Sequence, residues 1–157
     1  MSRPVYKDFS GKRAPSVTTI LGECKNPQGL MGWANRLGLE GIDYKEEQNK
    51  AAKIGTFAHK AIESYIKGID YVNTDPRVVQ ALESFKRWAD NMKIKFIALE
   101  VSLVCDCGEH PPYGGTVDCI AEMPTGLKVI DWKTSNTIYT DYKIQVATYA
   151  DRDWETN

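Results

Sequence analysis

The sequence predicts an α+β protein in which helices cover a small mixed β-sheet. In residues 1–92, apolar residues recur at the spacing of amphipathic helices, whereas from residue 94 the pattern changes to the alternating or continuous apolar runs of strands. One more helical segment follows the strands. We therefore treat 1–157 as a single domain, with a mainly helical part at 1–92 and a sheet core with a closing helix at 94–150.

Four helices are expected in the first part of the chain. Ser16 and Asp75 precede apolar periodic segments and are expected N-caps, because their oxygens can accept the unpaired N–H groups of the first turn. Glycines mark several helix ends, because glycine readily adopts the backbone conformation that terminates a helix. The expected helices run from Ser16 to Gly22, from Pro27 to Gly38, from Asp43 to Lys67, and onward from Asp75 and Pro76.

The long third helix contains Gly55, and a glycine inside a helix costs about 1 kcal/mol relative to alanine. Close approach of another backbone or of a substrate would explain its presence. His59 follows one turn later, on roughly the same side of the helix. A single helical histidine is more often structural than a ligand, so a site role for His59 depends on groups elsewhere in the chain.

Three strands and a closing helix are expected after the helical part. The closing helix begins at Asp141 as N-cap and carries Gln145 and Tyr149 on one face. Residues 151–157 lack an apolar strand pattern, so we expect that the final core strand is absent or that the gene is cut short. Such a loss would expose sheet backbone and favour a homodimer through that edge. The expected strands are Phe96 to Val104, Gly114 to Glu122 and Leu127 to Lys133.

The acids and the lysine of the last two strands suggest a metal site. Asp131 and Lys133 are two residues apart, so they point to one face while Trp132 points to the other. With Asp118 on the neighbouring strand, they supply oxygen ligands that suit Mg²⁺ or Mn²⁺, and an imidazole would favour Mn²⁺. Such an ion polarises a phosphodiester, and Lys133 would position the attacking water or neutralise developing charge.

Each of these groups also has a plainer interpretation. Asp131 and Lys133 could be a surface ion pair worth less than about 1 kcal/mol. Glu100, on the strand before Asp118, is either an accessory acid or a solvated side chain. The pair of Gln145 and Tyr149 could be only a polar helix edge.

The cysteines offer a weaker metal hypothesis. Cys105, Cys107 and His110 could hold zinc, with Cys119 beyond them, although close zinc-binding cysteines are usually separated by two or more residues. We favour a solvent-exposed hairpin there.

The N-terminus lacks the apolar core of a secretory signal, so the four cysteines are expected to be reduced thiols in a cytoplasmic protein. No apolar run is long enough for a membrane span. The net charge of −1 does not exclude a local nucleic-acid-binding patch.

Five motifs in order resemble the PD-(D/E)XK nuclease superfamily in its RecB-like branch. Within that branch the chain is most similar to phage and bacterial exonucleases related to the mitochondrial genome maintenance exonuclease, and the run from Ser16 to Leu21 supports this. The resemblance spans roughly residues 15–150; each motif alone is weak, and five in the right order are strong. The motifs are Gly55, Thr56 and His59; Glu100; Gly115, Thr116 and Asp118; Asp131 to Thr134; and Gln145 with Tyr149.

The resemblance implies a restriction-endonuclease-like core in αβββαβ order beneath a helical N-terminal part. It implies a Mg²⁺- or Mn²⁺-dependent exonuclease that acts on DNA, with single-stranded ends as the expected substrate, in phage or bacterial replication, recombination or repair. A structure-selective endonuclease and an inactive nucleic-acid-binding module are the alternatives, and polarity and DNA-versus-RNA preference stay open. The implied roles are metal binding by His59, Asp118, Asp131 and the Trp132 carbonyl, catalysis by Lys133 with Asp131, Asp118 and the accessory acid Glu100, and substrate contact by Gln145, Tyr149, Thr134 and Gly55.

Overall fold

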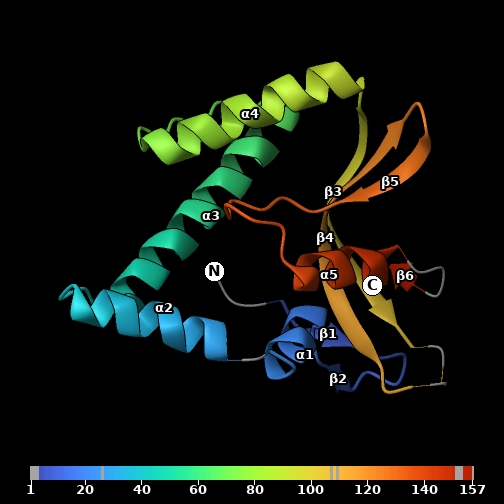
Figure 1. The fold of residues 1–157 in the computed structure, drawn as a ribbon. Helices are drawn as coiled ribbons and strands as arrows, with labels where there is room; N and C mark the ends of the chain where they lie inside the picture. The colour runs from blue at the N-terminus through green and yellow to red at the C-terminus, as the bar shows by residue number, and fades with distance from the viewer. Residues whose placement is uncertain (1–3, 26, 107, 109, 151–153, 157) are drawn as a thin grey trace. The chain divides into compact units, whose positions relative to one another are not determined.

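A computed structural model of the chain shows five helices and two small β-sheets among the described residues, which confirms the predicted α+β class (Figure 1). The structure describes residues 4–25, 27–106, 108, 110–150 and 154–156. The chain divides into two compact units: a sheet unit, Met1–Cys24 with Met92–Asn157, and a helical unit, Lys25–Asn91. The first 24 residues therefore group with the sheet, and the single domain stays a prediction.

The sheet unit contains a four-stranded sheet in the order β5-β4-β3-β6 and a separate two-stranded ribbon, β1-β2. All strand pairings in both are antiparallel, so the expected mixed sheet is wrong. Short connections join β3 to β4 and β4 to β5, and only antiparallel strands can be joined by such tight turns. The strands are β1 (Tyr6–Lys7), β2 (Arg13–Ala14), β3 (Lys95–Cys105), β4 (Tyr113–Met123), β5 (Gly126–Ile130) and β6 (Trp154–Thr156).

The strand β6 corrects the expectation that the closing strand is absent. Residues 154–156 pair with the end of β3, where Leu103 lies opposite Thr156. The backbone makes this short pairing, and a three-residue segment is too short to show an apolar alternation in the sequence. A homodimer through a sheet edge stays a prediction.

Two helices belong to the sheet unit, α1 (Val17–Glu23) and α5 (Thr140–Tyr149). Ser16 caps α1 as predicted, since its Oγ accepts the N–H of Thr19 at 3.0 Å. The predicted cap of α5 is wrong: the helix begins at Thr140 after Tyr139, and Asp141 lies inside the first turn. There its carboxylate still lies at the positive end of the helix dipole.

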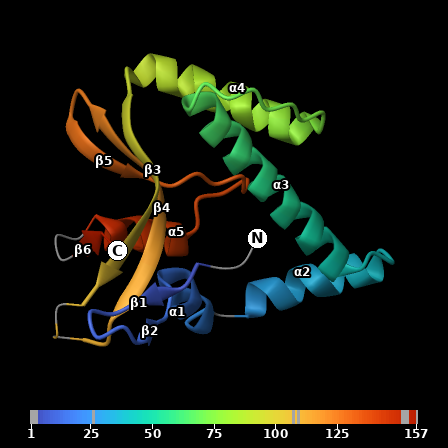
Figure 2. The ribbon, with the colours of Figure 1, turned by 180° about the vertical axis from the view of Figure 1, so that it is seen from behind.

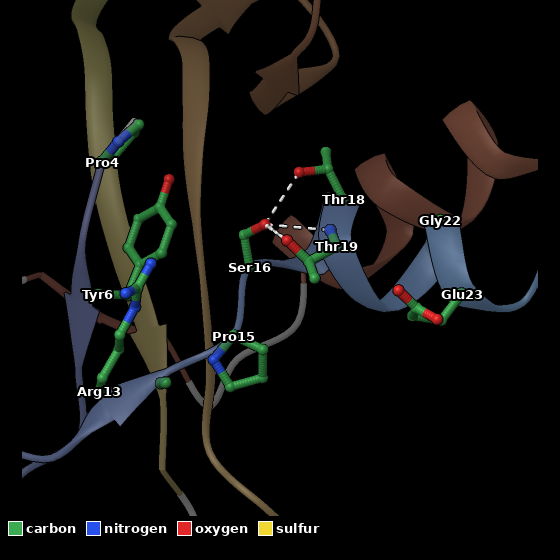
Figure 3. Close-up of a pocket in the computed structure, with 10 residues that line it drawn as sticks. Pro4, Tyr6, Arg13, Pro15, Ser16, Thr18, Thr19, Gly22 and Glu23 are labelled. Atoms are coloured by element: carbon green, nitrogen blue, oxygen red, sulfur yellow. Dashed lines mark hydrogen bonds between the residues drawn. The ribbon is translucent and has the colours of Figure 1, made fainter. Parts of the chain in front are cut away.

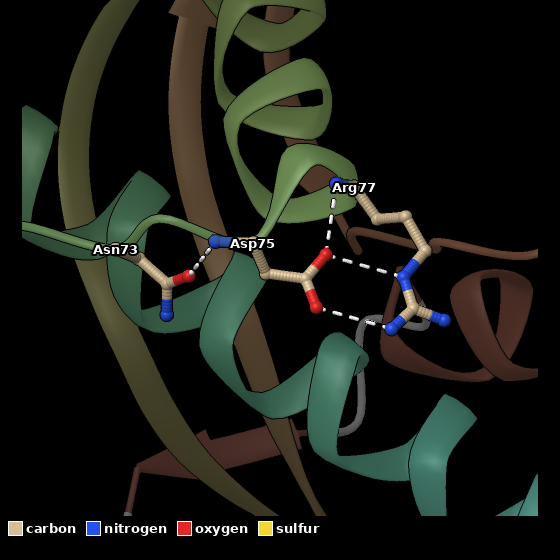
Figure 4. Close-up of polar contacts among 3 residues, drawn as sticks. All are labelled: Asn73, Asp75 and Arg77. Carbon is tan, nitrogen blue, oxygen red and sulfur yellow. Dashed lines mark hydrogen bonds and ion pairs between the residues drawn. The ribbon is translucent and has the colours of Figure 1, made fainter.

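The helical unit holds α2 (Gln28–Leu39), α3 (Tyr44–Ile66) and most of α4 (Pro76–Met92). The predicted cap of α4 is confirmed, since Asp75 accepts the N–H of Arg77 at 2.9 Å, and at the start of α3 Asp43 accepts the N–H of Lys45 at 2.8 Å in the same way. Arg77 also reaches back to Asp75 with its guanidinium, as Figure 4 shows. The buried side chains of these helices include Ala58, Ala61, Ile62, Val78, Phe85 and Ala89.

In the sheet unit, α1 and α5 contact each other and the strands beside them (Figures 1 and 2). Val17 of α1, Tyr149 of α5, and Leu103 and Val117 of the sheet form a buried apolar cluster. This cluster anchors α5, the helix that carries the predicted glutamine and tyrosine, against the strand that carries Asp118.

Two consecutive glycines of β4 make room for aromatic rings. A Cβ on Gly115 would lie 2.3 Å from the ring of Tyr149, and one on Gly114 would lie 2.3 Å from the ring of Tyr6. Consecutive strand residues point to opposite faces, so Tyr6 and Tyr149 pack against opposite faces of β4. Only glycine fits at either position without displacing a ring.

We predict that Gly115→Ala lowers the free energy of unfolding by roughly 1–3 kcal/mol, because the added methyl group overlaps the ring of Tyr149. Thermal unfolding of the purified variant measures this. Gly32→Ala is the matched control: it lies within α2, where a Cβ meets nothing within 4 Å, so alanine should be neutral or stabilising. Equal melting temperatures for Gly115→Ala and wild type would contradict the packing described here.

Candidate functional site

The hairpin of β4 and β5 brings the two predicted ligand acids together. Its register pairs Cys119 with Ile130 at the end of the ladder, and Asp118 and Asp131 are the next residues along the two segments. Strand β5 ends at Ile130, three residues before the predicted end at Lys133. The Oδ2 atom of Asp118 accepts the N–H of Trp132 at 2.6 Å. That bond occupies a backbone group that a longer ladder would need, which accounts for the early end of the strand.

Asp131 and Lys133 form an ion pair that is largely shielded from solvent. The Asp131 side chain is 3% exposed and the Lys133 side chain 22%, and the Lys133 ammonium contacts Asp131 Oδ2. The interpretation of this pair as an ordinary surface ion pair does not fit that burial. A buried carboxylate requires partners of this kind, because an ionised group is costly to remove from water.

Gln145 connects the carboxylate of Asp131 to the closing helix. Its Nε2 donates to Asp131 Oδ1 at 3.1 Å and to the hydroxyl of Tyr149 at 3.2 Å, which uses both N–H groups of the amide. Gln145 and Tyr149 are 6% and 4% exposed, so they are not a polar helix edge. Burial raises the pKa of Tyr149 to about 12, with a further rise from the charge of Asp131, so the phenol stays protonated at neutral pH.

Tyr142 is a site residue that the sequence reasoning missed. The Lys133 ammonium lies 5.1 Å from the centre of the Tyr142 ring, within the range of a cation–π contact. Tyr139 stacks edge-on against Tyr142 at 5.5 Å. The available signal was the helix period, because Tyr142 precedes Gln145 by three residues and shares its face.

Glu100 lies next to this site in the sheet register. The neighbouring pairs of Leu99 with Cys119 and Val101 with Val117 place Glu100 opposite Asp118. Its backbone adopts a φ of 53°, which is uncommon for a residue other than glycine and is found preferentially at functional sites. Its side chain is exposed, and the role of an accessory acid stays a prediction.

The remaining predicted residues are placed as follows. Gly55 and His59 lie on α3 in the helical unit, one turn apart and half-buried, and their roles as substrate contact and metal ligand stay predictions. Thr134 is exposed in the segment after Lys133, where its predicted role is also untested. The structure therefore brings together Asp118, Asp131, Trp132, Lys133, Gln145 and Tyr149 within the sheet unit.

These groups fit a hard divalent cation. Among the residues that the structure describes, no three His, Cys, Asp or Glu side chains are grouped so that they could hold a metal. Asp118 and Asp131 nevertheless provide two carboxylates with oxygen lone pairs left over, and the Trp132 carbonyl follows directly in the chain. Mg²⁺ commonly binds through one or two carboxylates and keeps several waters, so two carboxylates are within the range of donors that it uses, and metal binding here stays a prediction.

The zinc hypothesis gains no support from the described cysteines. Cys105 and Cys119 are buried, and Cys107 lies outside the described residues. Burial, with the charge of Asp118, raises the pKa of the Cys119 thiol to about 11, so a metal would displace its proton at a greater cost than from an ordinary cysteine. Zinc binding by Cys105, Cys107 and His110 stays a prediction.

Comparison with known proteins points to nucleases. No protein-family model matches the chain. The chain is similar to mitochondrial genome maintenance exonuclease 1 of Mus musculus, with 31% identity over an alignment 157 residues long. The match covers 85% of this chain and 40% of the mouse protein, so the chain spans less than half the length of that relative. This likeness supports a relationship to nucleases. Within the described part of the chain, none of the helices combines the length and the apolar composition of a membrane span.

We predict that Gln145→Leu destabilises the protein by roughly 1–3 kcal/mol, because buried atoms of Asp131 and Tyr149 each lose a hydrogen bond. Denaturant unfolding followed by fluorescence measures the change. Lys143→Leu, on an exposed position of the same helix, is the control and should be nearly neutral. If the two variants unfold at the same denaturant concentration, the network around Asp131 does not contribute to stability as described.

Proposed function

We propose that this protein is a metal-dependent deoxyribonuclease. Its active site, formed by Asp118, Asp131 and Lys133, would hydrolyse phosphodiester bonds of the substrate. The observation that carries the proposal is the contact of Asp118 with the backbone of Trp132, the residue after Asp131, together with a shielded lysine ammonium against Asp131. Oxygen ligands for a hard cation and a positive charge beside them are what phosphodiester hydrolysis requires. Similarity to a protein named as an exonuclease supports the same reaction.

Asp118, Asp131 and the carbonyl of Trp132 would hold Mg²⁺ or Mn²⁺, with His59 as a further predicted ligand. When bound, such an ion would polarise the phosphodiester and offset the negative charge that builds up on it. The protein orients Asp131 from two sides. Gln145 holds Oδ1, and Lys133 contacts Oδ2. The carboxylate is therefore fixed before any ligand arrives, which lowers the cost of reorganising the site.

Lys133 would act on the phosphate or on the attacking water. Its side chain keeps 22% exposure, so the ammonium can be reached from solvent while Asp131 and the ring of Tyr142 restrict its position. An ammonium held in this way stabilises the extra negative charge of the transition state without a large rearrangement. Glu100 would be an accessory acid beside Asp118.

The substrate would be DNA. The enzyme would act as an exonuclease on single-stranded ends, in replication, recombination or repair. Two features support this extension: the similarity to a genome maintenance exonuclease, and the resemblance of the motif order to RecB-like nucleases. A structure-selective endonuclease would use the same groups. A circular single strand separates the two modes, because an exonuclease has no end from which to start.

The activity is tested with 5′- and 3′-labelled single and double strands in Mg²⁺, Mn²⁺ or chelator. We expect metal-dependent cleavage by the wild type, and a rate at least about 100-fold lower for Lys133→Ala, because a cation at the reacting phosphate is lost. Lys143→Ala, an exposed lysine of α5, is the control and should cut at the wild-type rate. Equal rates for Lys133→Ala and wild type would remove Lys133 from the reaction.

Metal binding by Asp118 is tested separately from cleavage. Mn²⁺ at about 100 times its dissociation constant stabilises a protein that binds it by about 2.7 kcal/mol. We expect Asp118→Asn to lose most of this thermal shift, since the amide keeps an acceptor for the Trp132 N–H but loses the charge. Asp90→Asn, at an exposed position of α4, should retain it. A full shift in Asp118→Asn would exclude Asp118 from the ligand set.

A further inference from the structure

A second candidate binding site lies in the sheet unit, in a groove between the ribbon β1-β2 and helix α1 (Figure 3). We call it the ribbon groove. Its volume is about 880 Å³, which is within the range of ligand-binding clefts. Its lining includes Tyr6, Arg13, Ser16, Thr18, Thr19 and Glu23, and it contains none of Asp118, Asp131 and Lys133. The lining offers a guanidinium and hydroxyl groups, so it suits a polar ligand.

The ribbon beside the groove carries like charges that face each other. Lys7 of β1 lies directly opposite Arg13 of β2, and Lys12 precedes Arg13 in the chain. Like charges at directly opposed positions of an antiparallel pair destabilise it. The acid between them, Asp8, is occupied within the turn, where its Oδ1 accepts the N–H groups of Ser10 and Lys12. An anion bound at Lys7 and Arg13 would relieve this repulsion.

The two sides of the groove differ in charge. Figure 3 shows Arg13 on the ribbon side and Glu23 on the side of α1, with Ser16 and Thr19 between them. A small inorganic anion would use only the Arg13 side. A nucleotide strand offers a phosphate to Arg13 and, from its bases, hydrogen-bond donors that a carboxylate accepts. The polarity of the groove therefore favours a nucleic-acid strand.

The groove is attached to the strand that carries Asp118. The N–H of Gly114 in β4 donates to the carbonyl of Pro15 at 2.9 Å. The hydroxyls of Tyr6 and Thr116 are 2.8 Å apart, and Thr116 precedes Asp118 by two residues. The groove wall and the acid are thus held to the same strand within a few residues. A strand bound in the groove would have a fixed relation to the proposed cleavage site.

We propose that the ribbon groove binds the phosphodiester backbone of the nucleic-acid strand that is cleaved at Asp118 and Asp131, with Arg13 as the phosphate contact in the groove and Lys7, its cross-strand neighbour on the ribbon, as a second phosphate contact beside the groove. This inference rests on the proposed nuclease function for its substrate. Lys7 and Arg13 would contact the substrate at a distance from the bond that is cleaved. These phosphate contacts would supply affinity and register, and they carry no sequence preference.

Binding is tested without cleavage, in chelator, by fluorescence anisotropy of a labelled single strand of about 20 nucleotides, which exceeds the site size of most single-strand-binding modules. We expect Arg13→Gln to weaken binding about tenfold and to reduce the slope of log Kd against log salt by about 0.7, the loss of one phosphate contact. Lys7→Gln should act in the same direction. Lys128→Gln removes one exposed charge from β5 and is the matched control, with affinity and slope near those of the wild type.

The outcomes separate the groove from the nuclease activity. If Arg13→Gln and Lys7→Gln bind like Lys128→Gln, the groove proposal is overturned, even where the wild type cleaves DNA. If the two ribbon variants bind more weakly than the control and the wild type cleaves nothing in Mg²⁺ or Mn²⁺, the groove is supported and the nuclease function fails. Absence of strand binding by the wild type would overturn the groove proposal outright.

Discussion

The candidate site depends on the antiparallel register between β4 and β5. Because Cys119 pairs with Ile130 at the end of the ladder, Asp118 and Asp131 are the next residues along the two segments, and a shift of this register by one residue would change which residues follow the last pair. The bond from the Trp132 N–H to Asp118 ends the ladder there and holds the chain as it leaves the strand. Asp118 is therefore held within a paired strand, and Asp131 follows directly after the last paired residue, Ile130.

The closing helix supplies the second constraint. Gln145 holds Asp131 and Tyr149 at once, so a buried carboxylate and a buried hydroxyl are both satisfied by one amide. This arrangement requires Tyr149 to lie against β4, and Gly115 leaves the space for its ring. Two adjacent carboxylates repel each other, and the Lys133 ammonium offsets only part of that charge. The remaining negative charge is the electrostatic reason why a divalent cation suits this position.

The sequence predicted those features that depend on local patterns. The apolar alternation located the hairpin, and the caps Ser16 and Asp75 followed from side-chain chemistry that acts within one helical turn. The end of β5 was misplaced because a contact from Asp118, distant in the chain, decides it. The short strand β6 and the approach of Tyr142 to Lys133 likewise depend on contacts between distant segments. The ligand role of His59 is still a prediction from motif order.

The proposed chemistry requires that Asp118 and Asp131 form a divalent-cation site. The most direct measurement is anomalous X-ray diffraction from crystals of the protein soaked in Mn²⁺, because the anomalous signal locates the metal independently of activity. We expect one strong peak at about 2.0–2.3 Å from carboxylate oxygens of both aspartates, as is usual for metal–oxygen bonds. A peak only elsewhere, for example beside Cys105 and His110, or no peak at saturating Mn²⁺, would contradict it.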